Sequence, residues 1–321
     1  MLRFAAARAA QAALVALVVT TIAFVAIHLA PGDPFTLNPG DPPELEASRR
    51  EMRRVYGLDR PLIEQYPAMI GNLARGDFGT SLVRFRPVSE IVRVAVPRTI
   101  LLMVPALVLG FLGGAALGTW QGARPGRLAD RAASWVTLTA ASFPEFVIGL
   151  ALSTVLASRL HWFPALGMRD ARQIGGVGGL TDVAWHLVLP CVTLALAIGT
   201  TVARYQRAAV AAAMDEEFVR AARARGASPR DVLWRHVIPR TAGAMATVLG
   251  LLAPLLVGGA ALVETVFAWP GAGSTLVDAV TGRDYPVVIA FVLIGSIAVS
   301  FGSAVADVGA RAFNPALRDD A

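Results

Sequence analysis

The sequence predicts an all-α integral membrane protein with six transmembrane helices, and three observations predict it. Hydrophobic residues make up 55% of the 321 residues, charged residues only 16%, and the mean hydropathy is +0.58. A soluble domain of this length needs a less apolar composition for its core. Six apolar stretches approach the roughly 20 residues that cross the hydrocarbon core of a bilayer. The basic residues are all arginine and cluster between these stretches, as expected beside anionic lipid.

The six predicted spans are residues 9–30, 99–120, 132–157, 186–203, 241–263 and 286–308. The first also fits a secretory signal, because Arg3 and Arg8 precede its apolar run. That run is longer than a signal core, and Pro31-Gly-Asp-Pro34 follows it in place of a small-residue cleavage site. These features favour a retained span.

The placement of arginines predicts the orientation of the spans. Arginines fall before the first span, between the second and third, between the fourth and fifth, and after the sixth. By the positive-inside rule these segments, with both termini, face the cytoplasm. Residues 267–285 carry only Arg283, as an outside loop should. Residues 158–185 carry more arginines, but their glycine-rich tract at 175–179 indicates a flexible external loop.

The spans divide the chain into four predicted regions. Residues 1–30 form an N-terminal transmembrane helix and residues 31–97 an extracytoplasmic cap. Residues 98–310 form a core of five spans with a polar cytoplasmic segment at 207–240, and residues 311–321 form a cytoplasmic tail. Within the cap, residues 43–57 read as a helix that a glycine ends, and Tyr66, Met69, Ile70 and Leu73 recur at helical spacing. A disordered loop is the alternative for the cap.

The sequence lacks the residues that several classes of function require. The chain has no lysine, so it cannot build a phosphate-binding loop of the G-x-x-x-x-G-K-[ST] type. Its four histidines are scattered and Cys191 is alone, so we expect no metal site, no cofactor and no disulfide within the chain. The arginines are dispersed among spans, which argues against nucleic-acid binding. An intramembrane protease would have to pair His186 with Ser142 or Ser153, without any recognisable nucleophile motif.

Acidic residues in or near spans are costly and therefore suggest function. Glu145 follows Pro144 in the third span, and Glu264 closes the fifth. Ser142, Pro144, Glu145 and Glu264 are our candidates for lining or gating a translocation pathway. The alternatives are structural: Glu145 could face a wet cleft where Pro144 breaks the helix, and Glu264 could be a local hydrogen-bond acceptor.

Two further segments are polar or rich in turn residues. At 267–273 proline and glycines break the helix, and Trp269 is predicted to anchor the turn at the membrane interface. In the cytoplasmic segment, acids precede arginines between Asp215 and Arg225, which matches the dipole of a short helix that Gly226 ends. Ser228 and Pro229 are predicted to start a second helix that runs to His236.

The first of these cytoplasmic helices is predicted to be a docking surface. Ala221, Ala222 and Ala224 keep it thin, so that a groove on another protein can close around it, while its arginines pair with acids at the rim. The alternative is an amphipathic helix that rests on anionic lipid.

This segment resembles the cytoplasmic "EAA" loop of ABC importer permeases, whose pattern is E-A-A, three residues, G, nine residues, I-x-L-P. Ala221, Ala222, Gly226 and Pro239 match at that spacing, and Ile238 stands in for the leucine. Arg220 and His236 replace the glutamate and the isoleucine. The departure at Arg220 concerns the polarity of the contact that the loop makes.

Other stretches resemble the dipeptide/oligopeptide-type permease subunits in particular, and they extend over nearly the whole chain. They are His28-Leu-Ala-Pro-Gly-Asp-Pro34, Tyr56-Gly-Leu-Asp-Arg-Pro-Leu62, Gly76-Asp-Phe-Gly-Thr-Ser-Leu82, Glu264-Thr-Val-Phe-Ala-Trp-Pro-Gly-Ala-Gly273, Arg283-Asp-Tyr-Pro-Val-Val288 and Asn314-Pro315. The resemblance implies a type I importer permease fold in a bacterial-type inner membrane. It also implies non-catalytic transport of di- or oligopeptides by alternating access.

The resemblance further implies the partners: a second related permease, two cytoplasmic ABC ATPases that hydrolyse ATP, and an extracytoplasmic solute-binding protein that meets the cap. It makes the helix at 221–226 a coupling helix seated in an ATPase cleft. The expected coupling residues are Glu217, Arg220, Ala221, Ala222, Arg225, Gly226, Ile238 and Pro239. Nickel chelates and glycosides are alternative substrates within this family. An ion-coupled secondary transporter is the more distant alternative, although neither inverted repeats nor paired intramembrane carboxylates are visible.

Overall fold

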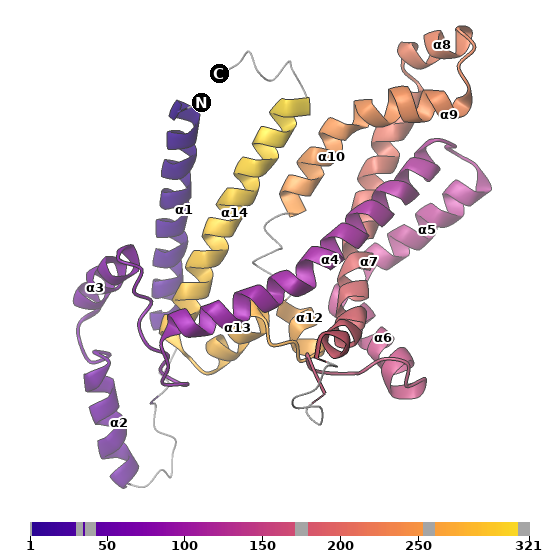
Figure 1. Ribbon diagram of the computed structural model, residues 1–321. Coiled ribbons are helices and arrows are strands. Elements are labelled where there is room, and N and C mark those ends of the chain that lie inside the picture. Colours follow the sequence, from indigo (N-terminus) through magenta and orange to yellow (C-terminus); the bar gives the residue numbers. More distant parts are fainter. Residues whose placement is uncertain (1, 30–34, 36–42, 171–178, 253–260, 314–321) are drawn as a thin grey trace. The chain divides into compact units, whose positions relative to one another are not determined.

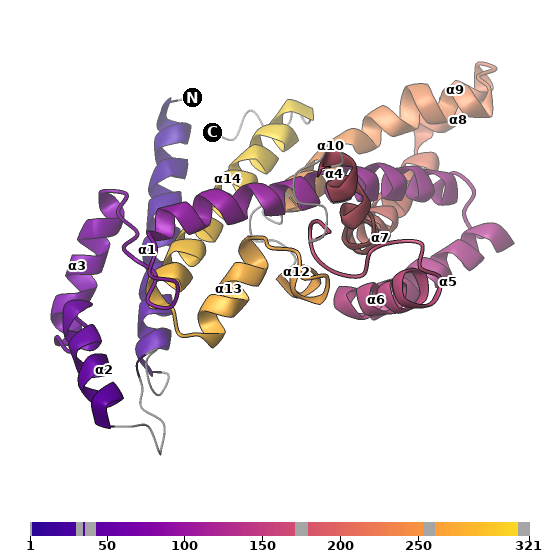
Figure 2. The same cartoon turned by 60° about the horizontal axis from the view of Figure 1, so that its bottom comes forward.

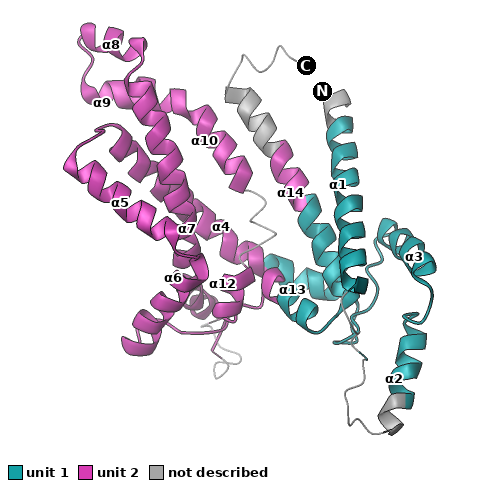
Figure 3. Cartoon of the chain, turned by 180° about the vertical axis from the view of Figure 1, so that it is seen from behind, with its two compact units in different colours: residues 1–97, 275–297 teal, residues 98–274, 298–321 magenta. Residues whose placement is uncertain are grey.

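A computed structural model describes residues 2–29, 35, 43–170, 179–252 and 261–313 of the chain (Figure 1). Nearly all of these residues are helical, which confirms the predicted all-α class. The chain divides into two compact units, each built from two stretches of sequence (Figure 3). Unit 1 comprises residues 1–97 and 275–297, and unit 2 comprises residues 98–274 and 298–321.

Four described helices are long and apolar enough to cross a membrane. They are α1 (Leu2–Leu29), α4 (Val88–Gly122), α7 (Gly179–Met214) and α14 (Tyr285–Phe313). They confirm the first, second, fourth and sixth predicted spans. α4 and α7 have 35 and 36 residues, well beyond the roughly 20 that a bilayer requires, so both extend outside it.

The third predicted span is not one helix. α5 (Leu128–Ser142) is followed by α6 (Glu145–Leu152) and the π-helical segment η1 (Ser153–Arg159), with a bend of 99° between the two parts. A single helix over 132–157 is therefore wrong, whereas the helix break at Pro144, which the structural alternative for Glu145 requires, is present. The break falls at Phe143 and Pro144, because the residue before a proline is held in extended backbone, and Phe143 has ψ 136°.

The fifth predicted span is described only in part. α10 (Ile238–Leu252) covers its first half, α12 (Ala261–Val266) begins at its end, and residues 253–260 lie outside the described residues. The total of six spans therefore stays a prediction. Most of the glycine-rich tract predicted at 175–179, and most of the predicted tail, also lie outside the described residues.

Unit 1 carries the predicted cap. α2 (Pro43–Val55) and α3 (Leu62–Ala74) confirm the two helices predicted there, and Gly57, at φ 67°, follows α2 in the left-handed conformation that glycine favours. α3 is attached to α1 by a hydrogen bond of 2.7 Å between the hydroxyls of Tyr66 and Thr21. Tyr66 is one of the residues whose helical spacing predicts α3, and its hydroxyl makes the polar contact with the first span.

A buried carboxylate fixes the turn that leads into α4. Asp284, 2% exposed, accepts a hydrogen bond from the Ser81 hydroxyl and another of 2.9 Å from the backbone N–H of Leu82. Both donors lie in a tight turn closed by the Thr80–Pro87 bridge. This carboxylate joins the turn to the residue directly before α14.

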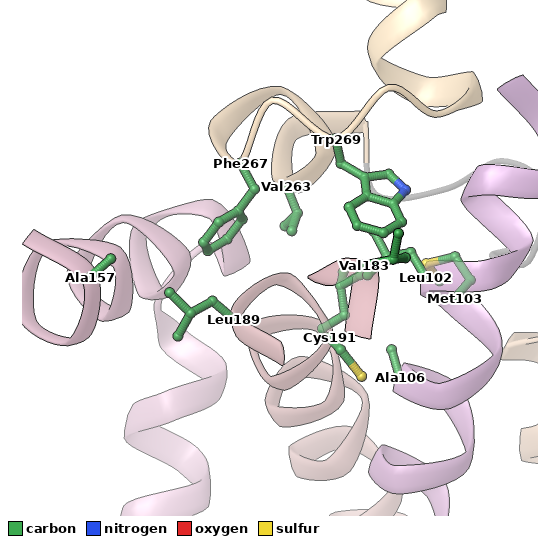
Figure 4. Packing of buried hydrophobic residues seen from close by; sticks show 11 residues of the cluster. Leu102, Met103, Ala106, Ala157, Val183, Leu189, Cys191, Val263, Phe267 and Trp269 are labelled. Atoms are coloured by element: carbon green, nitrogen blue, oxygen red, sulfur yellow. The ribbon is translucent and has the colours of Figure 1, made fainter. Parts of the chain in front are cut away.

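The core of unit 2 packs around the N-terminal half of α7 (Figure 4). Leu102 and Met103 of α4, Leu189 of α7 and Trp269 meet there. Trp269 is completely buried, and its indole N–H donates a hydrogen bond of 2.9 Å to the Arg98 carbonyl oxygen. The prediction of an interfacial lipid anchor is therefore wrong, because a tryptophan whose N–H has a protein partner can lie in a core.

The rest of α4 packs on α7 through a row of glycines. Gly110, Gly114, Gly118 and Gly122 recur every fourth residue, so they occupy one face of α4. A Cβ at Gly114 would lie 2.5 Å from the Gly199 carbonyl oxygen, and those at the other three would first meet the carbonyl oxygens of Ala195, Ala203 and Arg207. The two backbones thus touch, as in small-xxx-small packing in membranes, where close approach replaces the hydrophobic effect.

Candidate functional site

The polar segment after α7 forms a separate short helix, α8 (Glu217–Ala224), at the end of α7 (Figures 1 and 2). Glu217 lies in its first turn and Arg223 in its last, which matches the helix dipole. Gly226 follows at φ 85°, a conformation that other residues rarely adopt. The predicted short helix and its glycine stop are confirmed.

α8 has one buried face and one exposed face. Val219 and Ala222 are 0% and 2% exposed, and they pack on Val210, Val232 and Val237. The predicted coupling residues Glu217, Arg220, Ala221, Arg225 and Gly226 are all exposed. Ala222 therefore attaches α8 to its own chain, whereas Ala221 and the arginines face outward.

The second helix begins where it was predicted but does not end there. Ser228 caps α9 (Pro229–Asp231): its hydroxyl accepts a hydrogen bond of 3.2 Å from the Asp231 N–H and donates one of 2.5 Å to that carboxylate. This hydrogen bond, with the charge of Arg235, lowers the pKa of Asp231. Acceptance of a backbone N–H by a serine at this position is the usual N-cap.

Beyond α9 the helix continues through the π-helical segment η2 (Val232–Val237) into α10, so the predicted end at His236 is wrong. Pro239 lies in the first turn of α10 and is exposed, and Ile238 is half-buried. A proline in a helix lacks one N–H donor and clashes with the carbonyl four residues earlier. The wider π turn directly before Pro239 is where the helix accommodates it.

Two turns before the end of α7, an ion pair joins this helix to the start of α5. Arg207 donates from Nε and Nη2 to the two carboxylate oxygens of Asp130, at 2.7 and 2.8 Å. Asp130 is 2% exposed and also accepts the Gly126 N–H at 2.9 Å. Sequence reasoning missed this ion pair between Asp130 and Arg207, which we call the clasp. The signal for it was the single acidic residue in the arginine-rich run at 124–131. Such paired hydrogen bonds fix geometry as well as charge.

Around the bend between α5 and α6 lies a cavity of about 300 Å³. Glu145, the first residue of α6, lines it; Pro144 and Ser142 are exposed beside it, and the Ser142 hydroxyl donates to the Leu138 carbonyl oxygen at 2.9 Å. Within the described parts of the chain, the Glu145 carboxylate has no hydrogen-bond or ion-pair partner.

Glu264 lies in a different setting from Glu145. It is completely buried, and its carboxylate accepts hydrogen bonds from the Thr99 hydroxyl at 2.6 Å and the Ser274 N–H at 2.9 Å. Ser274 is in the first turn of α13 (Ala272–Thr281), so Glu264 caps that helix and ties it to α4. These contacts give Glu264 a structural role within unit 2.

Among the described residues, the remaining candidates do not form a catalytic group. The Nδ1 of His186 lies 2.9 Å from the Asp182 carbonyl oxygen and 3.1 Å from its carboxylate, and among the described residues no serine hydroxyl bonds to it. Over the same residues, no three His, Cys, Asp or Glu side chains gather as metal ligands.

Comparison with known proteins gives two family matches that together span nearly the whole chain. A model of the "binding-protein-dependent transport system inner membrane component" family matches residues 110–319, and that of its N-terminal region matches residues 1–103. The oligopeptide transport system permease protein AppB of Bacillus subtilis is 35% identical over 90% of this chain and 91% of its own length. The glutathione transport system permease protein GsiC of Escherichia coli is 36% identical, over 94% of each.

A solved structure shares the fold. The inward-facing MetNI methionine ABC transporter matches with a TM-score of 0.53 at 17% identity, over 70% of this chain and 97% of that one. With the membrane-spanning helices, these matches make the protein an integral component of an inner membrane. The chain belongs to the binding-protein-dependent transport family and is a permease subunit of an ABC importer.

Proposed function

We propose that this permease forms half of the translocation pathway for di- or oligopeptides. Support for the peptide substrate comes from the relatives: AppB is named for oligopeptides and GsiC for glutathione, itself a peptide, and each aligns along nine-tenths or more of this chain. A second, related permease subunit supplies the other half. An extracytoplasmic binding protein delivers the peptide to unit 1, and both termini of the permease lie in the cytoplasm, as the arginine distribution favours.

We further propose that α8 is the coupling helix, and its two faces are the observation that carries this proposal. Val219 and Ala222 hold it to the chain, so a force on the outward face reaches α7 and α10 and is not absorbed by a loose loop. The small side chains of Ala221 and Ala224 allow another protein to approach that face closely. The exposed arginines can form ion pairs with acidic residues of an ATPase cleft. ATP is hydrolysed by two ATPase subunits that grip this helix, and their closure switches the pathway between its inward-open and outward-open states.

Ala221→Trp tests the coupling role. Ala221 is exposed, so a large side chain there leaves the permease core intact but enlarges the face that enters the ATPase cleft. We expect peptide uptake by the reconstituted complex to fall about fivefold or more, with loss of ATPase subunits from the purified permease, since overfilling a packed interface costs roughly 1–3 kcal/mol.

Ala132→Trp is the matched control for this experiment. Ala132 is also an exposed alanine of unit 2, but it lies on α5. We expect this variant to retain uptake and ATPase subunits. Normal uptake and a normal ATPase content in Ala221→Trp would contradict the coupling role of α8. Uptake of nickel chelates or glycosides, without uptake of peptides, by the unmodified complex would contradict the peptide assignment instead.

A further inference from the structure

The cavity at the α5–α6 bend is lined by one acidic and one basic side chain, and neither has a partner among the residues that the structure describes. It is lined by the end of α5, the bend, one face of α7 and Leu252 at the end of α10. Its two charged residues have opposite signs: Glu145 at the bend and Arg204 on α7. In the described parts of the chain neither side chain makes an ion pair or a hydrogen bond, with each other or with any other group.

The α7 side of the cavity combines a strip of polar residues with the apolar Ile198. Ala197, Thr201 and Arg204 recur at helical spacing, with Thr200 beside them, and this face differs from the one on which the α4 glycines lie. The Thr200 hydroxyl donates to the Ala197 carbonyl oxygen at 2.9 Å. Its oxygen keeps acceptor capacity, because a hydroxyl has two lone pairs in addition to its one proton. The Thr200 and Thr201 hydroxyls can therefore accept hydrogen bonds from N–H groups of a ligand, beside the guanidinium of Arg204.

Glu145 is half-buried within the third predicted span, and Arg204 is exposed directly after the fourth, so both charges are accessible to a ligand in the cavity. Charged side chains within membrane segments are rare and mark the path of a substrate or an ion. A peptide with free ends carries an ammonium and a carboxylate at neutral pH, and moving both into a poorly hydrated passage carries a large desolvation penalty. One carboxylate and one guanidinium offset both charges without reading any side chain of the peptide.

We propose that this cavity is a transit site for zwitterionic peptides. Glu145 binds the ammonium of the peptide, Arg204 binds its carboxylate, and the Thr200 and Thr201 hydroxyls accept its backbone N–H groups. The volume of about 300 Å³ is at the small end of ligand pockets, so the site suits a di- or tripeptide, or the two ends of a folded longer one. This inference rests on the proposed peptide function and adds the chemistry by which the pathway recognises its substrate.

The test uses the complete importer in liposomes with trialanine, N-acetyl-trialanine and trialanine amide as probes, each at a concentration that saturates the binding protein. We expect Glu145→Gln to lower import of trialanine and of its amide about tenfold and to leave the N-acetyl peptide unchanged. Arg204→Gln should lower import of trialanine and the N-acetyl peptide by a similar factor and spare the amide. Tenfold is the loss expected for one charge-assisted hydrogen bond.

Two further variants separate recognition from folding. Arg240→Gln removes an exposed arginine outside the cavity and should leave all three rates unchanged. The double reversal Glu145→Arg/Arg204→Glu should recover part of the trialanine import, because a zwitterion can bind in the opposite direction. If both single variants lower the three rates equally, or change none, the transit site is refuted. If the unmodified complex imports none of the three probes, the peptide function itself fails.

Discussion

Gly114→Leu is expected to prevent α4 and α7 from packing, whereas Gly113→Leu on the same helix is expected to be tolerated. A Cβ at Gly114 would lie 2.5 Å from the Gly199 carbonyl oxygen and 2.8 Å from the Val202 Cβ, whereas a Cβ at Gly113 has no neighbour within 4 Å. Backbone atoms cannot move aside as a flexible side chain can, so the helices must separate. We expect a loss of about 3 kcal/mol or more for Gly114→Leu.

Gly113→Leu controls for every other consequence of this substitution. Both changes replace a glycine by a good helix former within one helix, which by itself favours the helix by up to about 1 kcal/mol. Gly113 is exposed and points away from α7, so a leucine there adds apolar surface beside lipid. The readouts are the yield of monodisperse protein after gel filtration and the midpoint of thermal unfolding in detergent. Equal midpoints for the two variants would refute the close contact between α4 and α7.

The second large effect is expected at the clasp between Asp130 and Arg207. Asp130→Arg leaves a guanidinium in a site that is 2% exposed, opposite Arg207. Removing one partner of a fully buried ion pair costs roughly 3 kcal/mol; because the Arg207 side chain is 36% exposed, we expect a smaller loss here, to which the new repulsion adds. We expect a lower unfolding midpoint and nearly complete loss of peptide import. The reversed pair Asp130→Arg/Arg207→Asp should recover part of both.

Arg131→Asp is the matched control, because it also reverses a charge in the first turn of α5 but at an exposed position. It should leave the unfolding midpoint and import near those of the unmodified protein. The ratio of ATP hydrolysed to peptide imported adds a second readout. If the clasp makes the start of α5 and the end of α7 move together during transport, the reversed pair restores this ratio together with stability. The two single variants, Asp130→Arg and Arg207→Asp, are also measured separately. If the loss in the reversed pair equals the sum of their separate losses, a direct pair is contradicted.

Local signals in the sequence were sufficient for the cytoplasmic segment. Acids before arginines, a glycine stop and a Ser-Pro start predict α8 and the beginning of α9, because short helices are bounded by caps and dipoles that lie within a few residues. The continuation through His236 was not predicted. A π turn depends on how Pro239 is accommodated by the preceding helix, and the identities of neighbouring residues do not specify that.

Contacts between distant segments could not be predicted in the same way. Glu264 was considered for a gate or for a local acceptor, but its donors come from Thr99 and Ser274, the first of which is far away in the sequence. The preference of tryptophan for headgroups predicts Trp269 at a membrane interface. Its actual partner, the Arg98 carbonyl oxygen, is a backbone group that no sequence pattern marks. The four-residue glycine spacing in α4 indicates a face for close helix packing, but it does not indicate that the packed helix is α7.

The glycine row has a consequence for how these two helices can move. α4 and α7 run in the same direction along their contact, and small or backbone surfaces repeat on both every four residues. A repeat of this kind admits a second fit one helical turn away, since a shift of about 5.4 Å brings each glycine opposite the next carbonyl. The Gln206 amide of α7 donates a hydrogen bond of 2.9 Å to the Thr119 hydroxyl of α4, and this polar contact stands outside the glycine repeat, so it selects a single register out of several that the backbone alone would permit.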